Sequence, residues 1–195
     1  SVWLIGHSMG GAVAMLVAAI APDRVRGLIV LDNMGPLSAK AEDRVVTLQR
    51  AINKMSKYRL DRSTSYPSKE AMVLARMAGF TALSKSASEF LVDRGAKKSA
   101  DGIWRWRHDG KLTFPSPYRM DEEGVGAFLQ QIKCPTLALV AKDGIYKDDH
   151  QLVEARSAQF PWVKLKWLEG NHHFHLEPES CFAVATEIQR FIDQN

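Results

Sequence analysis

Ser8 stands in the pentapeptide Gly6-His7-Ser8-Met9-Gly10, which fits the pattern G-x-S-x-G. A serine hydroxyl attacks a carbonyl carbon well only when it projects clear of the chain and meets a base that takes its proton. A sharp turn between a strand and a helix lifts the side chain into such a position. Ser8 is therefore a candidate nucleophile, and a glycine-rich structural turn is the simpler alternative.

The residues around this pentapeptide predict a strand before it and a helix after it. Residues 2–5 are apolar, as in a short buried strand, and residues 12–21 are rich in Ala, Val and Leu, as in a buried helix. We expect positions 6 and 10 to require glycine, because side chains there would collide across the turn. The backbone N–H of Met9 would then point at a developing oxyanion, at the positive end of the helix.

Strand and helix patterns alternate in both outer parts of the chain. Residues 28–31 form a second apolar run that is typical of a buried strand. Beyond residue 120 the sequence predicts a helix that begins at Asp121, a strand at 135–140, a helix at 149–158, a strand at 163–167 and a helix at 178–192. Such alternation predicts a mostly parallel sheet with helices on both faces.

The middle of the chain follows a different pattern. Apolar residues recur there at three- and four-residue spacing, which predicts amphipathic helices. They are Val45, Leu48, Ile52 and Met55, and then Met72, Ala75, Ala78 and Ala82. Residues 103–107 alternate and run into Asp109-Gly110, which predicts a small hairpin with residues 112–114. We therefore divide the chain into core residues 1–36, a mainly helical insertion at 37–120 and core residues 121–195.

The sequence Gly-His-Ser-Met-Gly-Gly at residues 6–11, in this strand and helix context, resembles the α/β-hydrolase superfamily in its cap-bearing branch. The resemblance extends to Trp-Arg-Trp-Arg-His-Asp at 104–109, Cys-Pro-Thr-Leu at 134–137 and Gly-Asn-His-His at 170–173. Within the superfamily the sequence is similar to the serine hydrolase-like proteins. The resemblance implies an α/β fold: the α/β-hydrolase sheet from the nucleophile strand onward, mostly parallel, with an inserted helical cap.

In this family the catalytic histidine lies in the loop after the last strand, here residues 170–177. Counting back three residues from the His175-Leu176 pair gives His172, whose Nε2 would take the Ser8 proton. His173 is the alternative base if the family motif is matched one residue later. His175 would hydrogen-bond within the loop. The histidine run is also rich in metal ligands, but no carboxylate or cysteine nearby completes a set, so we predict no metal.

A carboxylate should orient this histidine through Nδ1–H, and family members place it after one of two strands. Asp32 directly follows the apolar run at 28–31. Asp143 lies in Ala-Lys-Asp-Gly at 141–144, one position earlier than the usual Gly-x-x-Asp spacing. We favour Asp32 as the acid, with Asp143 as the alternative.

The resemblance implies a serine hydrolase that cleaves an ester-like bond (a carboxylic ester, a thioester or an amide) through an acyl-enzyme, with no cofactor. Its substrate would be small and apolar, and side chains of the insertion would line the acyl pocket. We name Met55, Met72, Met77, Phe80 and Trp104 for this lining. Two alternatives stay open: a non-catalytic binding or scaffold protein of this fold, and a carbon–carbon bond hydrolase.

Family members have several strands before the nucleophile, and a loop among them supplies a second oxyanion donor. The present sequence opens directly in the nucleophile strand. We therefore expect it to be a fragment or one piece of a split polypeptide, and to be inactive by itself.

The composition is that of a globular protein, since 46% of the residues are hydrophobic and 25% are charged, which favours a packed core over disorder. Basic and acidic residues interleave, and no basic groove accompanies the Trp and Arg residues at 104–107, so we predict no nucleic-acid partner. No apolar run reaches the roughly 18 residues of a membrane span. Cys134 and Cys181 are expected to be unpaired thiols, and nothing demands an oxidising compartment, so we expect a cytoplasmic protein.

Overall fold

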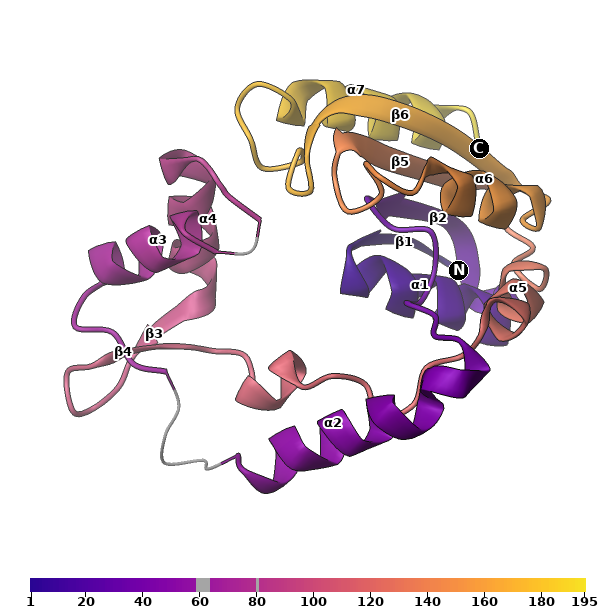
Figure 1. Cartoon of the computed structure of the whole chain (residues 1–195). Coiled ribbons are helices and arrows are strands. Elements are labelled where there is room, and N and C mark those ends of the chain that lie inside the picture. Colours follow the sequence, from indigo (N-terminus) through magenta and orange to yellow (C-terminus); the bar gives the residue numbers. More distant parts are fainter. Residues whose placement is uncertain (59–63, 80) are drawn as a thin grey trace. The chain divides into compact units, whose positions relative to one another are not determined.

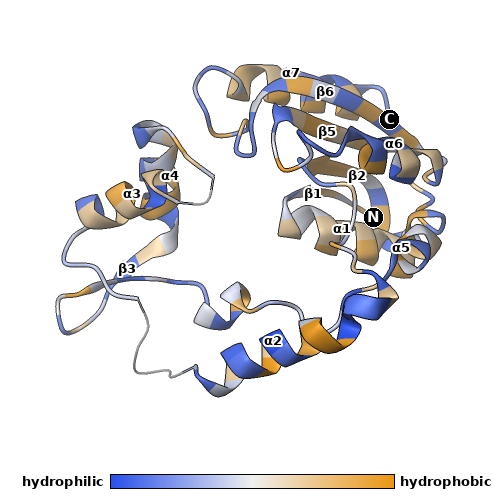
Figure 2. Cartoon of the chain, in the orientation of Figure 1, coloured by the Kyte–Doolittle hydropathy of each residue, from blue (hydrophilic) through white to orange (hydrophobic). Residues whose placement is uncertain are grey.

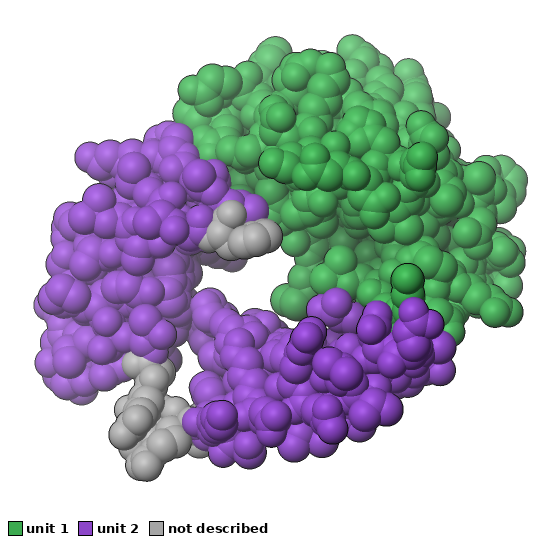
Figure 3. All heavy atoms as spheres, viewed as in Figure 1, with its two compact units in different colours: residues 1–40, 120–195 green, residues 41–119 purple. Residues whose placement is uncertain are grey.

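The computed structural model describes residues 1–58, 64–79 and 81–195. It divides into two compact units (Figures 1 and 3). The core unit comprises residues 1–40 and 120–195, and the inserted unit comprises residues 41–119 between these two segments.

A parallel sheet of four strands forms the centre of the core unit, in the order β1-β2-β5-β6 (Figure 1). The strands are β1 (Val2–His7), β2 (Val25–Leu31), β5 (Thr136–Asp143) and β6 (Val163–Asn171). The helices of this unit are α1 (Met9–Ile20), α5 (Glu122–Leu129), α6 (His150–Ala158), α7 (Cys181–Asp193) and the short 3-10 helix η1 (Pro22–Arg24). The predicted α/β fold class, with its mostly parallel sheet, is confirmed.

Helices bury both faces of the central strands β2 and β5. In β2, Leu28 and Val30 belong to a cluster that includes residues of α1, α5 and α6. Ile29 and Leu31 point to the other face and join a cluster with Phe191 of α7. This two-sided burial explains why β2 and β5 read as continuous apolar runs, because neither face of a covered parallel strand meets water. The prediction of a buried strand at residues 2–5 is wrong, since Val2 and Ile5 of the edge strand β1 are 57% and 53% exposed.

Among its described residues, the inserted unit has three α-helices and a two-stranded antiparallel ribbon. They are α2 (Arg44–Ser56), α3 (Lys69–Met77), α4 (Lys85–Gly95), β3 (Ala96–Lys98) and β4 (Trp104–Trp106), with the 3-10 helices η2 (Ala41–Asp43) and η4 (Gly110–Thr113). Along α2, hydrophobic and hydrophilic residues alternate (Figure 2), as the spacing of apolar residues predicts. Its apolar side chains Val45, Leu48, Ile52 and Met55 are exposed.

The residues proposed to line an acyl pocket have different surroundings. Met72 is fully buried in the core of the inserted unit, where Met77 and Trp104 pack against its cluster. Met55 is exposed. Phe80 lies outside the described residues.

The predicted hairpin between residues 103–107 and 112–114 is wrong. β4 pairs with β3, and its Trp104 also forms an isolated bridge with Tyr66, so partners from elsewhere occupy both of its edges. Asp109 caps the 3-10 helix η4 by accepting a hydrogen bond from the N–H of Lys111. The Asp-Gly pair therefore starts a helical turn instead of a strand turn.

Two further features of the described residues agree with the sequence. Both cysteines are free thiols: Cys134 is buried and Cys181 is half-buried. None of the helices in the described ranges has the length and apolar character needed to cross a bilayer.

The buried Arg156 of α6 ties the segment after β2 to the start of α5. Its guanidinium donates a bidentate pair of hydrogen bonds to Glu122, and also donates to the Met34 carbonyl at 3.1 Å and to the Ser38 hydroxyl at 3.3 Å. A buried arginine is tolerated because these partners replace the water it lost. The pair lowers the pKa of Glu122, through the hydrogen bond from Arg156.

Arg156→Ala should lower the free energy of unfolding by about 2–3 kcal/mol, because the Met34 carbonyl and Glu122 lose their partner while a cavity opens. Urea denaturation measures this difference. Arg190→Ala is the matched control: it removes an exposed arginine from its ion pair with Glu187, which keeps Lys166 as a partner, and its cost should stay below about 1 kcal/mol. Equal losses for the two variants would contradict a structural role for Arg156.

Candidate active site

Ser8 occupies a strained turn between β1 and α1. Its φ of 52° lies in the left-handed region that residues with side chains rarely adopt. A Cβ on Gly6 would lie 2.4 Å from the Gly10 carbonyl oxygen, so glycine is required there. The same expectation for Gly10 is wrong, since a Cβ there meets nothing within 4 Å in the described residues. Gly11 makes the second close approach: its Cβ would lie 2.9 Å from Cβ of Asn33.

Backbone hydrogen bonds hold the turn in place. The N–H of Ser8 donates to the Leu31 carbonyl of β2 at 3.0 Å, and the Ser8 carbonyl accepts from the N–H groups of Gly11 and Ala12. Helix α1 begins at Met9, so the Met9 amide belongs to the positive N-terminal end of a 12-residue helix. This is the position expected for a donor to an oxyanion.

Asp32 follows β2 and is the second non-glycine residue with positive φ in the described chain, at 44°. Its side chain is completely buried. Oδ1 accepts from the N–H of Ala141 and Oδ2 accepts from the N–H of Ile145, each at 3.0 Å. Backbone donors therefore hold the carboxylate at the carboxyl end of β5 and stabilise its negative charge.

His172 connects Asp32 to Ser8. Its Nδ1 lies 2.5 Å from Oδ2 of Asp32, and its Nε2 lies 3.0 Å from Oγ of Ser8. Since an ionised carboxylate can only accept, Nδ1 carries the proton and Nε2 is left as the acceptor for the serine hydroxyl. The structure thus brings together three of the residues selected from the sequence, in the order nucleophile, base and acid.

The two alternative residues lie elsewhere. Asp143 is exposed at the end of β5, in register with Asn171 of β6, whereas His172 pairs with Asp32. His173 is buried, and its backbone N–H donates to Oδ1 of Asn171 at 2.7 Å. The geometry therefore favours Asp32 over Asp143, and His172 over His173.

Sequence reasoning missed the contact that His7 makes. Its Nε2 donates to the backbone carbonyl of His172 at 2.7 Å, because a carbonyl can only accept. The bond joins the residue before the nucleophile to the base, across 165 positions of sequence. The only sequence signal is that His7 sits inside the elbow pentapeptide, and its partner in a distant loop is set by the fold.

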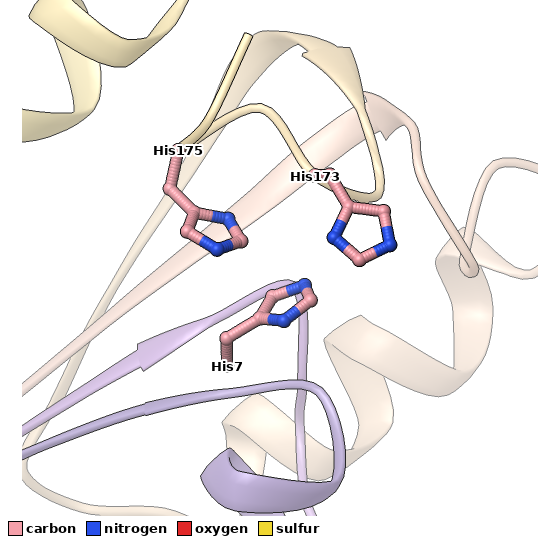
Figure 4. Close-up of side chains that lie close together, drawn as sticks. All are labelled: His7, His173 and His175. Carbon is pink, nitrogen blue, oxygen red and sulfur yellow. The ribbon is translucent and has the colours of Figure 1, made fainter. Parts of the chain in front are cut away.

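His7, His173 and His175 form a histidine cluster (Figure 4). The cluster lies beside the Ser8–His172–Asp32 group, since the ring centroids of His7 and His172 are 4.5 Å apart. The ring centroids of His173 and His175 lie 4.9 and 4.2 Å from that of His7. Burial lowers the pKa of His7 to about 4, and His175 adds to this shift. Burial also lowers the pKa of His175 to about 4, with a further contribution from His172. Both rings are therefore neutral at neutral pH, which is the form that binds metal ions.

Comparison with known proteins places the chain among hydrolases of this fold. A model of the alpha/beta hydrolase family matches residues 1–185. A serine hydrolase-like protein of Dictyostelium discoideum is 30% identical over 190 residues, which are 92% of this chain and 53% of that protein. A serine hydrolase-like protein of Danio rerio is 28% identical, over 95% of this chain and 59% of that protein.

A solved structure is also similar to this chain in sequence and in fold. The crystal structure of a hypothetical protein from Pseudomonas aeruginosa is 31% identical, with a TM-score of 0.86, over 98% of this chain and 67% of that chain. The resemblance to the serine hydrolase-like group, read from the motifs, is confirmed. The chain spans little more than half the length of the curated relatives it matches.

Gly144→Ala should slow the reaction of Ser8 with a fluorophosphonate by about 100-fold, because displacement of a catalytic group by about 1 Å has an effect of this size. A Cβ at Gly144 would lie 2.4 Å from both carboxylate oxygens of Asp32. The labelling rate followed by intact-mass spectrometry measures the effect. Gly124→Ala in α5 is the control and should label within about twofold of the unmodified protein; an unchanged rate in Gly144→Ala would contradict the geometry around Asp32.

Proposed function

The chain belongs to the alpha/beta hydrolase family, and from this premise we propose that it carries the active site of a serine hydrolase acting on ester-like substrates. The observation that carries the proposal is the continuous hydrogen-bonded line from Asp32 through His172 to Ser8. A nucleophile, a base and an orienting acid within hydrogen-bonding distance are the arrangement that acyl transfer requires.

In the first half of the reaction, Oγ of Ser8 attacks the carbonyl carbon of the substrate while its proton passes to Nε2 of His172. The imidazolium that forms is stabilised by the Asp32 carboxylate, which accepts from Nδ1–H and is itself held by two backbone N–H groups. Collapse of the tetrahedral intermediate returns the proton from Nε2 to the leaving group, and an acyl-serine remains.

In the second half, water replaces the leaving group. His172 takes a proton from the water as the hydroxide attacks the acyl carbon, and then returns it to Oγ of Ser8. In both halves the Met9 N–H, at the start of α1, would donate to the oxyanion. Because the helix fixes this amide, it needs no reorganisation when the charge develops. The positive end of the helix also stabilises the oxyanion.

The substrate class rests on the family and on the nucleophile. A serine hydroxyl forms an acyl ester from a carboxylic ester, a thioester or an amide, and the acyl group is then released by water. We propose that residues 41–119, inserted between the two segments of the core unit, act as a cap that selects the acyl group. A small apolar substrate is the class we assign.

One of the two arguments for the non-catalytic alternative is the shifted position of Asp143; the other is the lack of strands before the nucleophile strand. Since Asp32 contacts Nδ1 of His172, the site has an acid without Asp143, and this argument for a decayed site loses its force. A carbon–carbon bond hydrolase would use the same three residues, so substrate assays have to separate it from an esterase.

The proposal is tested by intact-mass spectrometry of the full-length protein before and after treatment with a fluorophosphonate. We expect one adduct per chain, absent in Ser8→Ala and present in a control that replaces an exposed serine, Ser116→Ala. A folded protein that forms no adduct, or an adduct that persists in Ser8→Ala, would overturn the proposal.

Asp32→Asn should lower the kcat for hydrolysis of a p-nitrophenyl ester by about 10³- to 10⁴-fold, because the neutral amide neither fixes the tautomer of His172 nor stabilises its cation. Asp143→Asn, an equally conservative change, should keep kcat within about twofold. The reverse order of the two effects would identify Asp143 as the acid and contradict the assignment of Asp32.

A further inference from the structure

We propose that His7, His173 and His175 bind one divalent transition-metal ion, with Zn²⁺ as the ion tested first, and that the bound ion restrains the neighbouring Ser8–His172 pair. The site is separate from the three residues of the proposed reaction. It replaces the expectation of no metal, which considered only the histidine run at 172–175 and not His7. The claim that these histidines bind a metal ion is independent of the proposed function. The claim that the ion inhibits the reaction rests on the proposed function.

Two parts of the chain contribute the ligands. His7 is the last residue of β1, and His173 and His175 come from the turn that follows β6 (Figure 4). Each ring offers one nitrogen such that all three lie within 4.8 Å of one another. In a tetrahedral zinc site, with Zn–N bonds of about 2.0–2.1 Å, ligand nitrogens lie about 3.3 Å apart. Ring rotations together with a small approach of the two segments would close this difference.

The chemistry of the three side chains selects the class of ion. Imidazole nitrogen suits Zn²⁺, Cu²⁺ and Ni²⁺, whereas Mg²⁺ and Ca²⁺ prefer oxygen ligands. Three histidines are also enough for a zinc ion that keeps a water molecule in its fourth position.

Two features of the cluster suit metal ligands. His7 donates Nε2–H to the carbonyl of His172, the kind of outer hydrogen bond that fixes the ring of a ligating histidine and leaves Nδ1 with the lone pair. The Nδ1 atom of His175 is buried, and no hydrogen-bond partner lies within reach in the described part of the chain. A buried polar atom of this kind is costly unless a ligand or water satisfies it.

The cluster is coupled to the reacting residues through the backbone. His7 directly precedes Ser8, and His173 directly follows His172. The distance of 3.0 Å between Nε2 of His172 and Oγ of Ser8 therefore depends on the two segments that a metal ion would draw together. A metal bound to His7 and His173 would shift this distance, and a misplacement of about 1 Å is enough to slow the reaction by about 100-fold.

The binding claim is tested by calorimetric titration of ZnCl₂ into the full-length protein after treatment with EDTA and dialysis. We expect one zinc per chain, and an affinity at least about 100-fold lower in His173→Gln and in His175→Gln, since the loss of a ligand exceeds the about 10- to 100-fold effect of losing an outer partner. His108→Gln, at an exposed histidine of the inserted unit, is the matched control and should keep the wild-type affinity. Circular dichroism checks that each variant is folded.

Three results would overturn the binding claim: no saturable zinc binding, unchanged affinity in both folded cluster variants, or equal binding of MgCl₂. Ser8→Ala should bind zinc normally, because Ser8 is not a ligand. These measurements do not use the reaction, so they remain decisive even if Ser8 proves unreactive.

The inhibition claim is tested by the rate of fluorophosphonate labelling at increasing zinc concentrations. Labelling should slow with the same half-saturation as the calorimetric titration, and His175→Gln should be resistant at zinc concentrations that saturate the unmodified protein. A labelling rate that is unaffected at full zinc occupancy would refute the inhibition and leave the metal site in place.

Discussion

The buried carboxylate of Asp32 is the interaction on which the site depends. It accepts from the backbone of Ala141 and Ile145 and from Nδ1 of His172, so it joins the ends of β2 and β5 to the turn after β6. These strands are neighbours in a parallel sheet, and their carboxyl ends meet at one edge. The register of the sheet therefore sets the position of the acid, and through His172 the position of the base.

The same edge stores conformational strain. Ser8 and Asp32 are the non-glycine residues with positive φ in the described chain, and each such conformation costs about 1–3 kcal/mol. Both have backbone N–H groups bonded to the neighbouring strand, Ser8 to Leu31 and Asp32 to Leu139. The sheet ladder thus continues into the two strained residues, and this explains how their side chains can leave the strands without disordering the edge.

Much of this arrangement could be predicted from the sequence, because strands and the turn at Ser8 leave local patterns in it. Continuous apolar runs identify strands of a covered parallel sheet, and the glycines around Ser8 identify the elbow. The sequence favoured Asp32 but left Asp143 open, since each follows or ends an apolar strand. The pairing of β5 with β2 decides which carboxylate reaches His172. The contacts of His7 could not be predicted either, because its partners lie more than 160 residues away in the sequence and only the fold brings them together.

The electrostatic balance of the edge follows from burial. During the proposed reaction a positive charge would appear on His172, and a second cation nearby would oppose it. Burial keeps the pKa of His7 and of His175 at about 4, so both neighbours stay neutral while His172 has the Asp32 carboxylate as its counter-charge. Two neutral imidazoles beside a charge-bearing one are compatible with acyl transfer, and they are also the form in which imidazole accepts a metal ion. The physical condition that protects the proposed chemistry of His172 is therefore the same one that suits the histidine cluster to the metal ion we propose.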